Sequence, residues 1–229
     1  MGIRKGFTLA EVLITLVIIG VIAAITIPSL MNKTNEQDTV VAVKKAYSIL
    51  SQAYQRVVAE NGEINPSALG SDDTEATKTF GEMFVKQLNV QKVCGMEAGG
   101  DCYPNVMYKL FNGSDWSNFN NSSTDFKIRL SDGMSVSMYI FSAFQNYGES
   151  QPLSNMFGFI NVDINGDKTP NTLGKDVFQF YVTKYGLVPL GIAEDTHYPL
   201  STCFDLGSGC ATWVLTKGNV DYWHKDVSW

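Results

Sequence analysis

The sequence predicts an α+β protein in which a long N-terminal α-helix, transmembrane in its first half, packs on an antiparallel β-sheet of four to five strands. Residues 7–30 form an apolar run long enough to cross a bilayer, and apolar residues then recur at helical spacing to about residue 60. Further along, segments of alternating apolar and polar residues flank turn residues, which is the pattern of β-hairpins. The 229-residue chain is long enough for one globular domain with an appendage.

Composition and motifs exclude several classes of protein. A hydrophobic content of 45% is too high for a disordered or collagen-like chain, and a single long apolar run excludes a polytopic membrane protein. The net charge of -6 argues against nucleic acid as a partner, because phosphate contacts need a basic face. The common hydrolase and nucleotide-binding strings (HExxH, G-x-S-x-G, GxGxxG and the P-loop) do not occur, so we expect no enzymatic activity.

The apolar run contains one charged side chain, Glu11, between Phe7 and Leu30. A charge at the centre of a membrane helix costs roughly 2.5 to 3.5 kcal/mol on insertion scales, so Glu11 marks a function and needs a partner. The run is too long for a cleaved signal peptide, and we expect it to be retained. Arg4 and Lys5 precede it, so the positive-inside rule places the amino end in the cytoplasm and the rest of the chain outside.

Residues 4–30 read RKGFTLAEVLITLVIIGVIAAITIPSL, and this segment closely resembles the amino terminus of type IV pilins and of type II secretion pseudopilins. The matching features are a basic leader ending in Gly6, the F-T-L-x-E-x-L-I run from Phe7, and Gly20 and Pro28 inside the following helix. The resemblance implies a pilin-like fold and cleavage by a prepilin peptidase between Gly6 and Phe7, with N-methylation of Phe7. It also implies that Glu11 neutralises the amino-terminal charge of a neighbouring subunit, and that the stretch between Gly20 and Pro28 can unwind in a filament.

Charge placement supports the same role for Glu11. Removal of Gly6 leaves a cationic amine on Phe7, one helical turn from the Glu11 carboxylate, where the helix amino terminus adds partial positive charge. The sequence leaves open whether this carboxylate pairs with the amine of its own chain or with that of the next subunit.

The resemblance also implies a division of the chain and a function. The parts are a cleaved leader (1–6), a transmembrane and assembly helix (7–30), an amphipathic helical stem (31–61) and an extracytoplasmic globular domain (62–229).

We expect a subunit of a type IV pilus or a type II secretion filament, held in the cytoplasmic membrane before assembly into a periplasmic or cell-surface filament. Its implied partners are other subunits, the prepilin peptidase, an inner-membrane assembly platform and membrane lipid. The alternative is a membrane-anchored binding module for calcium or a glycan.

The helical pattern continues beyond the membrane run, to a stop signal at Asn61 and Gly62. Apolar residues recur there at steps of three and four and form one stripe of an amphipathic helix: Val40, Val43, Tyr47, Leu50, Tyr54 and Val57. We expect this stripe to pack on the protein's own sheet, with a partner helix as the alternative.

The remaining elements follow from shorter patterns. A helix is expected near residues 79–88, with Thr79 and Glu82 as a capping box. Alternating residues on both sides of Asp132 and Gly133 predict a hairpin. The predicted strands are 126–130, 134–140, 157–164, 177–183 and 187–190.

Four cysteines occur as two close pairs, Cys94 with Cys102 and Cys203 with Cys210. Four cysteines allow three connectivities, and short separations in polar, Gly-rich segments favour the two local disulfides. Free thiols and a metal site are the alternatives, although the spacing differs from that of common zinc sites.

The segment DINGDKTPNTLGKD, residues 163–176, has oxygen-bearing side chains at alternate positions. Asp163, Asn165 and Asp167 match positions 1, 3 and 5 of an EF-hand calcium loop, and Asn171 or Asp176 would complete the ligand shell. The segment departs from that loop, with Lys168 at position 6 and Gly174 at position 12. A turn between strands is therefore the alternative. Several pseudopilins bind calcium near the carboxyl end, so calcium is the cofactor that we consider here, although the sequence requires none.

Overall fold

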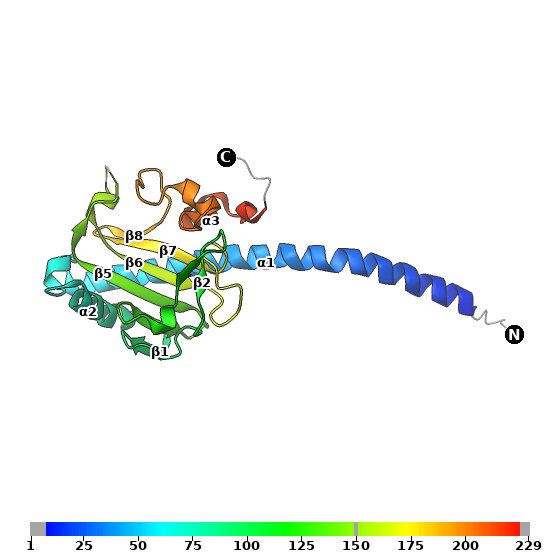
Figure 1. Ribbon diagram of the computed structural model, residues 1–229, viewed down its shortest axis with the longest axis horizontal. Helices are drawn as coiled ribbons and strands as arrows, with labels where there is room; N and C mark the ends of the chain where they lie inside the picture. Colours follow the sequence, from blue (N-terminus) through cyan, green and yellow to red (C-terminus); the bar gives the residue numbers. More distant parts are fainter. Residues whose placement is uncertain (1–7, 149–150, 225–229) are drawn as a thin grey trace. The chain divides into compact units, whose positions relative to one another are not determined.

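A computed structural model describes residues 8–148 and 151–224 of the chain (Figure 1). Two units are present, Met1–Asp38 and Thr39–Trp229. Helix α1, Leu9–Asn61, contributes to both units and is continuous through Gly20 and Pro28. The predicted long N-terminal helix is therefore confirmed.

In the first unit, α1 exposes apolar side chains on every side. Large aliphatic residues are exposed from Leu9 to Met31, and Leu9 itself is 81% exposed. Among the described residues, α1 is the helix whose length and composition would allow it to cross a membrane. A helix that is apolar all round needs an apolar environment, either lipid or other helices.

The second unit is built around a six-stranded antiparallel sheet in the order β1-β4-β5-β6-β7-β8. The strands are β1 Val90–Gly95, β4 Phe126–Leu130, β5 Ser135–Gln145, β6 Met156–Asp163, β7 Val177–Thr183 and β8 Gly186–Pro189. The sheet thus has more strands than the expected four to five, and the additional strand relative to the five predicted ranges is β1. As an edge strand with an irregular register against β4, β1 shows no clear alternation of buried and exposed residues.

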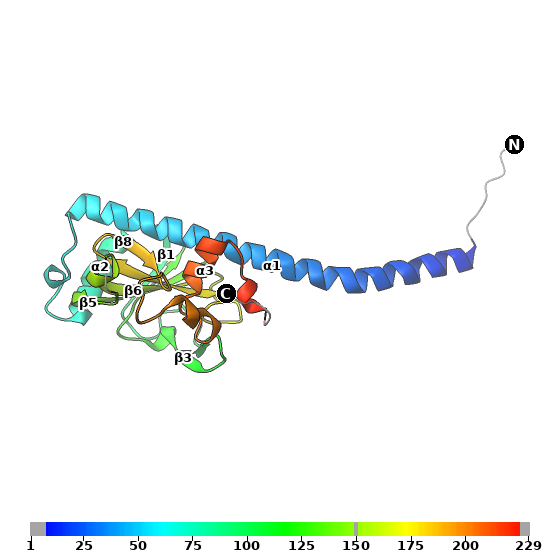
Figure 2. The ribbon, with the colours of Figure 1, turned by 90° about the horizontal axis from the view of Figure 1, so that it is seen from above.

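Helix α1 covers one face of this sheet along residues 39–61 (Figure 2). The predicted stripe is confirmed, since Val43, Leu50 and Val57 are almost fully buried in the same core as the inward-facing sheet residues. Two tyrosines add hydrogen bonds to the last two strands of the sheet, β7 and β8. Tyr54 donates its hydroxyl to the Thr183 carbonyl at 2.8 Å, and Tyr47 donates to the Leu187 carbonyl at 3.2 Å.

A small second sheet lies on the other side of the main sheet from α1 (Figure 2). It consists of β2, Tyr108–Lys109, and β3, Asp115–Ser117. Around it, Tyr103, Tyr108 and Phe119 pack edge to face or tilted, with ring centroids 4.9 to 6.0 Å apart. Strands of two and three residues carry too little alternation to be recognised in the sequence, so neither was predicted.

Helix α2, Asp73–Val85, corrects the prediction for residues 79–88. Its N-cap is Asp72, whose carboxylate accepts the Glu75 backbone N–H at 2.9 Å, so Thr79 and Glu82 do not form the expected capping box. The remaining elements are helix α3, Cys210–Lys217, and 3-10 helices at Pro66–Ala68, Phe119–Asn121, Leu153–Asn155, Leu200–Phe204 and Asp221–Trp223.

Two valines of α1 provide a matched test of the contact between helix and sheet. Val43 is fully buried, whereas Val41 is 65% exposed. Val43→Ala should lower the free energy of unfolding by about 2 kcal/mol, because it removes buried methyl groups and leaves a cavity. Val41→Ala should change it by less than about 0.5 kcal/mol. Urea unfolding of the full-length protein in detergent, followed by near-UV circular dichroism, measures both. Equal effects of the two substitutions would contradict the packing.

Candidate functional site

The start of α1 positions the Glu11 carboxylate. The backbone N–H and the hydroxyl of Thr8 donate to Oε2 of Glu11 at 2.8 and 2.7 Å. In return, the Glu11 backbone N–H donates to Thr8 Oγ1 at 3.3 Å. Thr8 and Glu11 therefore form a capping box, which fixes both the beginning of the helix and the direction of the carboxylate. The two hydrogen bonds that the Glu11 carboxylate accepts from Thr8 both end on the same oxygen, Oε2.

Sequence reasoning missed the role of Thr8, although the T-x-x-E spacing of residues 8–11 is the signal for it. The processing residues Gly6 and Phe7 lie outside the described residues. Gly20 and Pro28 are within α1, and a Cβ placed on Gly20 would meet no atom within 4 Å.

Both predicted local disulfides are present, Cys94–Cys102 and Cys203–Cys210. The first joins the end of β1 to the segment that leads into the small sheet. The second joins Cys203, in the 3-10 helix Leu200–Phe204, to Cys210, the first residue of α3. Both of these cysteines are fully buried. The free-thiol and metal alternatives do not apply to these residues.

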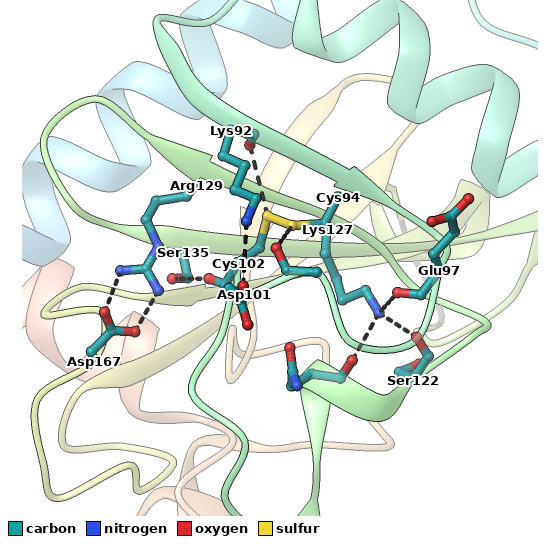
Figure 3. The surroundings of a disulfide bond; sticks show 12 residues. Lys92, Cys94, Glu97, Asp101, Cys102, Ser122, Lys127, Arg129, Ser135 and Asp167 are labelled. Atoms are coloured by element: carbon teal, nitrogen blue, oxygen red, sulfur yellow. Dashed lines mark hydrogen bonds and ion pairs between the residues drawn. A yellow bond between two sulfur atoms is a disulfide. The ribbon is translucent and has the colours of Figure 1, made fainter.

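Beside the first disulfide, the buried Lys127 side chain gathers three backbone carbonyls (Figure 3). Its ammonium group donates to the carbonyls of Glu97 at 2.8 Å and Asn120 at 3.3 Å, and to that of Ser122. Burial lowers the pKa of Lys127, while the nearby Asp125 raises it. The lysine thus supplies a positive charge to three backbone carbonyls, of which that of Asn120 also accepts the Gly99 N–H at 2.7 Å.

The loop between β6 and β7 contains the side chains predicted to bind calcium. Asp167 is 68% exposed, and its carboxylate pairs with the Arg129 guanidinium, with Nη1 3.1 Å from Oδ2 (Figure 3). The other four residues form a connected group. Asn165 joins the two buried carboxylates, since its backbone N–H donates to Asp163 Oδ1 at 3.1 Å and its amide Nδ2 donates to Asp176 Oδ2 at 3.3 Å.

Backbone and side-chain donors hold both carboxylates in place. Asp163 also accepts the Gly166 N–H at 2.8 Å and the Tyr108 hydroxyl at 2.5 Å. Asp176 accepts the backbone N–H groups of Asn171 and Thr172, each at 2.6 Å. Every donor in this set is neutral. Within residues 8–148 and 151–224, neither carboxylate forms an ion pair with Lys or Arg.

Burial makes two negative charges unfavourable at this position. It raises the pKa of Asp163 to about 7; the hydrogen bond from Tyr108 opposes this rise and the charge of Asp176 adds to it. Burial also raises the pKa of Asp176, against the hydrogen bonds from Thr172 and Asn171. A cation between these groups would relieve both effects.

The described residues contain no group of three or more His, Cys, Asp or Glu side chains arranged to hold a metal ion. The connected group in the loop instead has two carboxylates, Asp163 and Asp176, and two amides, Asn165 and Asn171. Over the described ranges, four buried side-chain N or O atoms lack a hydrogen-bond partner, and two of them are the amide oxygens of Asn165 and Asn171. Sequence reasoning selected both asparagines from their spacing, whereas Tyr108 is distant in sequence and carried no signal.

An apolar helix with a single acid near its start, followed by an α+β domain, defines a class of membrane-anchored, single-pass proteins. Residues 1–27 match the family model of the prokaryotic N-terminal methylation motif, the prepilin-type cleavage and methylation signature of type IV pilins and pseudopilins. Proteins with this motif are in general processed by prepilin peptidase and assemble into pilin polymers, and the family is structural rather than catalytic. Comparison with curated proteins returned no match, and neither did comparison with solved structures.

Two lysines near the first disulfide allow a matched test. Lys127→Met should lower the free energy of unfolding by about 2 kcal/mol, because the carbonyls of Glu97 and Ser122 would lose the hydrogen bond from the ammonium group, while that of Asn120 would keep the bond from the Gly99 N–H. Lys92 is half-exposed and 3.6 Å from the exposed Asp101 carboxylate, so Lys92→Met should change the free energy by less than about 0.5 kcal/mol. Urea unfolding of both variants makes the comparison. If Lys127→Met left the free energy of unfolding unchanged, the ammonium group would not be needed for stability.

Proposed function

We propose that this protein is a structural subunit of a type IV pilus-like or type II secretion filament. The observation that carries the proposal is the methylation motif at residues 1–27, located at the start of a helix with apolar side chains on every side. Prepilin peptidase cleaves the chain between Gly6 and Phe7 and methylates the new amino terminus. The protein then waits in the cytoplasmic membrane until its helix joins a growing filament.

The exposed part of α1 supports this mode of assembly. Aliphatic side chains such as Ile14, Ile19 and Ile25 are more than half exposed, and the same surface suits lipid before assembly and neighbouring helices afterwards. A transfer between two apolar environments changes little hydrophobic free energy, so polar contacts decide the register of the subunits. In this proposal, Glu11 makes that contact with the Phe7 amine of a neighbouring subunit.

Charge and cysteine chemistry support the proposed orientation. Arg4 and Lys5 lie before the apolar helix, which keeps the amino end in the cytoplasm by the positive-inside rule. The globular unit then lies outside the cytoplasm, where its two disulfides persist because the compartment is oxidising. After assembly, the same unit faces the periplasm or the cell surface on the outside of the filament.

The alternative function, an anchored binding module, uses the same helix without polymerisation. It predicts that the processed protein remains a monomer in the membrane. The two functions therefore differ in assembly and not in processing.

Processing is tested by mass spectrometry of the protein isolated from a host with an active prepilin peptidase. We expect an amino terminus at Phe7 that carries one methyl group. Gly6→Leu should abolish cleavage, whereas Gly2→Ala, within the same leader, should leave it unchanged. A wild-type protein that keeps an intact bond between Gly6 and Phe7 under these conditions would refute the proposal.

Assembly is tested with Glu11→Gln, which keeps the size of the side chain and removes its charge. The loss of one partner from a charge pair in apolar surroundings should lower the sheared filament fraction by about tenfold or more. Glu36→Gln is the matched control on the same helix and should assemble as the unchanged protein does. If Glu11→Gln is cleaved normally and also assembles normally, the carboxylate does not set the register.

A further inference from the structure

The face of the main sheet that points away from α1 is only partly covered. Ser135, Asp163 and Val177 form one row across β5, β6 and β7. The layer of the small sheet covers this row, since the Tyr108 hydroxyl donates to Asp163 and Val177 is buried in the same cluster as Tyr108. Beyond it, aromatic side chains of these strands and of the adjoining loops lie on the same face, and most of them are only half-buried. We call this group the aromatic face, and it consists of Tyr139, Phe141, Tyr147, Phe159, Tyr181 and Tyr198.

Phe159 lies at the centre of the aromatic face. Its ring centroid is 5.3 to 6.4 Å from those of Phe141, Tyr147, Tyr181 and Tyr198. The contacts with Phe141, Tyr147 and Tyr198 are edge-to-face, an arrangement that aromatic pairs prefer and that fixes the orientation of the rings. A partly exposed apolar surface with polar groups at its border is typical of an interaction site.

A row of neutral polar side chains borders the aromatic face. Ser137, Asn161 and Gln179 are paired across β5, β6 and β7. The Asn161 amide donates to Ser137 Oγ at 3.1 Å, and the Gln179 amide donates to Asn161 Oδ1 at 2.8 Å. Ser137 and Asn161 are buried, whereas Gln179 is half-buried. Gln179 is thus held by its amide nitrogen, and its Oε1 atom accepts no hydrogen bond from the described residues.

Tyr147 and Tyr198 add two hydroxyl groups to the aromatic face. Within the described part of the chain, neither hydroxyl has a hydrogen-bond partner. The Tyr147 ring stacks on the His197 imidazole with centroids 4.0 Å apart, and the Tyr198 backbone N–H donates to Asp195 Oδ1 at 2.8 Å. Both tyrosines are therefore held in place by other contacts, which leaves their hydroxyls available to a ligand.

The groups that the aromatic face leaves available are uncharged. Two carboxylates contact its tyrosines, and both are used within the protein: Asp73 accepts the Tyr139 hydroxyl at 3.0 Å, and the buried Asp195 accepts the Tyr181 hydroxyl at 2.9 Å. Burial raises the pKa of Tyr147, so its hydroxyl stays protonated. A ligand that matches this surface is uncharged, with C–H groups for the rings and hydroxyls for the polar positions.

We propose that the aromatic face binds a neutral saccharide chain. One side of a pyranose ring is lined by C–H groups, which stack on Phe141 and Phe159. The hydroxyls at the edge of the sugar both donate and accept, so they satisfy the Gln179 amide oxygen and the two tyrosine hydroxyls. Ligand sites in proteins combine aromatic surface with a few oriented polar groups in this way. The proposal does not rest on filament assembly, because the aromatic face belongs to the second unit alone.

Binding is tested with the full-length protein in nanodiscs, which keep it apart from other subunits. The probes are three uncharged hexasaccharides, maltohexaose, cellohexaose and chitohexaose, and the anionic hexagalacturonate. Isothermal titration should give a dissociation constant below about 1 mM for at least one uncharged probe. Hexagalacturonate should bind at least about tenfold more weakly, because the face offers no cation. Preference for chitohexaose would identify an N-acetylated glycan as the ligand, and preference for the other two a plain glucan.

Matched variants locate the binding. Phe141→Ala should weaken it by about tenfold through loss of a stacking ring. Phe144→Ala, on the same strand but packed on Phe157, should change it by less than about twofold. Gln179→Leu should weaken it by about fivefold through loss of one neutral hydrogen bond, whereas Gln91→Leu, on the exposed part of β1, should have no effect. Near-UV circular dichroism checks that each variant is folded.

Three outcomes would overturn the proposal. The first is no binding of any uncharged probe by the wild-type protein at about 10 mM. The second is binding that survives both Phe141→Ala and Gln179→Leu, which would place the ligand elsewhere. The third is a Phe141→Ala variant that loses filament assembly while the wild-type protein binds no saccharide, which would make the aromatic face a contact between subunits.

Discussion

The packing of the apolar stripe of α1 on the sheet is the contact on which the rest of the globular unit depends. An antiparallel sheet must bury at least one face, and in this protein residues 39–61 of α1 supply the cover. Tyr47 and Tyr54 fix the helix along the sheet through hydrogen bonds to carbonyls at the β7–β8 end. Once that face is covered, the opposite face can support the small sheet and the loops around it. The fold therefore has a helix layer, a sheet layer and an irregular layer.

The irregular layer contains two clusters of oxygen atoms that accept hydrogen bonds from different kinds of donor. Around Lys127, three backbone carbonyls converge on an ammonium group from the chain itself. In the loop after β6, the Asp163 and Asp176 carboxylates both accept hydrogen bonds from Asn165, and no ammonium or guanidinium group pairs with them among the described residues. The first cluster thus has a positive charge from its own chain, whereas the two buried carboxylates of the second are held by neutral donors.

Prediction from the sequence succeeded for elements in which the pattern of apolar and polar residues repeats over several consecutive turns or residue pairs. The bounds of β4 and β7 agree with the predicted strands, and the stripe from Val40 to Val57 is buried. It failed for β1, β2 and β3, because an irregular edge strand and strands of two or three residues have too little periodicity. It also placed the start of α2 too late, since Asp72 and not Thr79 caps that helix.

The sequence by itself determined the apolar helix with its lone acid, the basic segment before it, the pairing of cysteines close in sequence, and the spacing of oxygen-bearing side chains after β6. These features are encoded by neighbours along the chain, so periodicity and spacing reveal them. The tertiary structure alone decided that Arg129 takes Asp167, that Tyr108 meets Asp163, and that Lys127 is buried. These contacts join residues brought together by strand pairing and by the layer above the sheet. Their free energy depends on burial and on the direction of each donor, which no local pattern records.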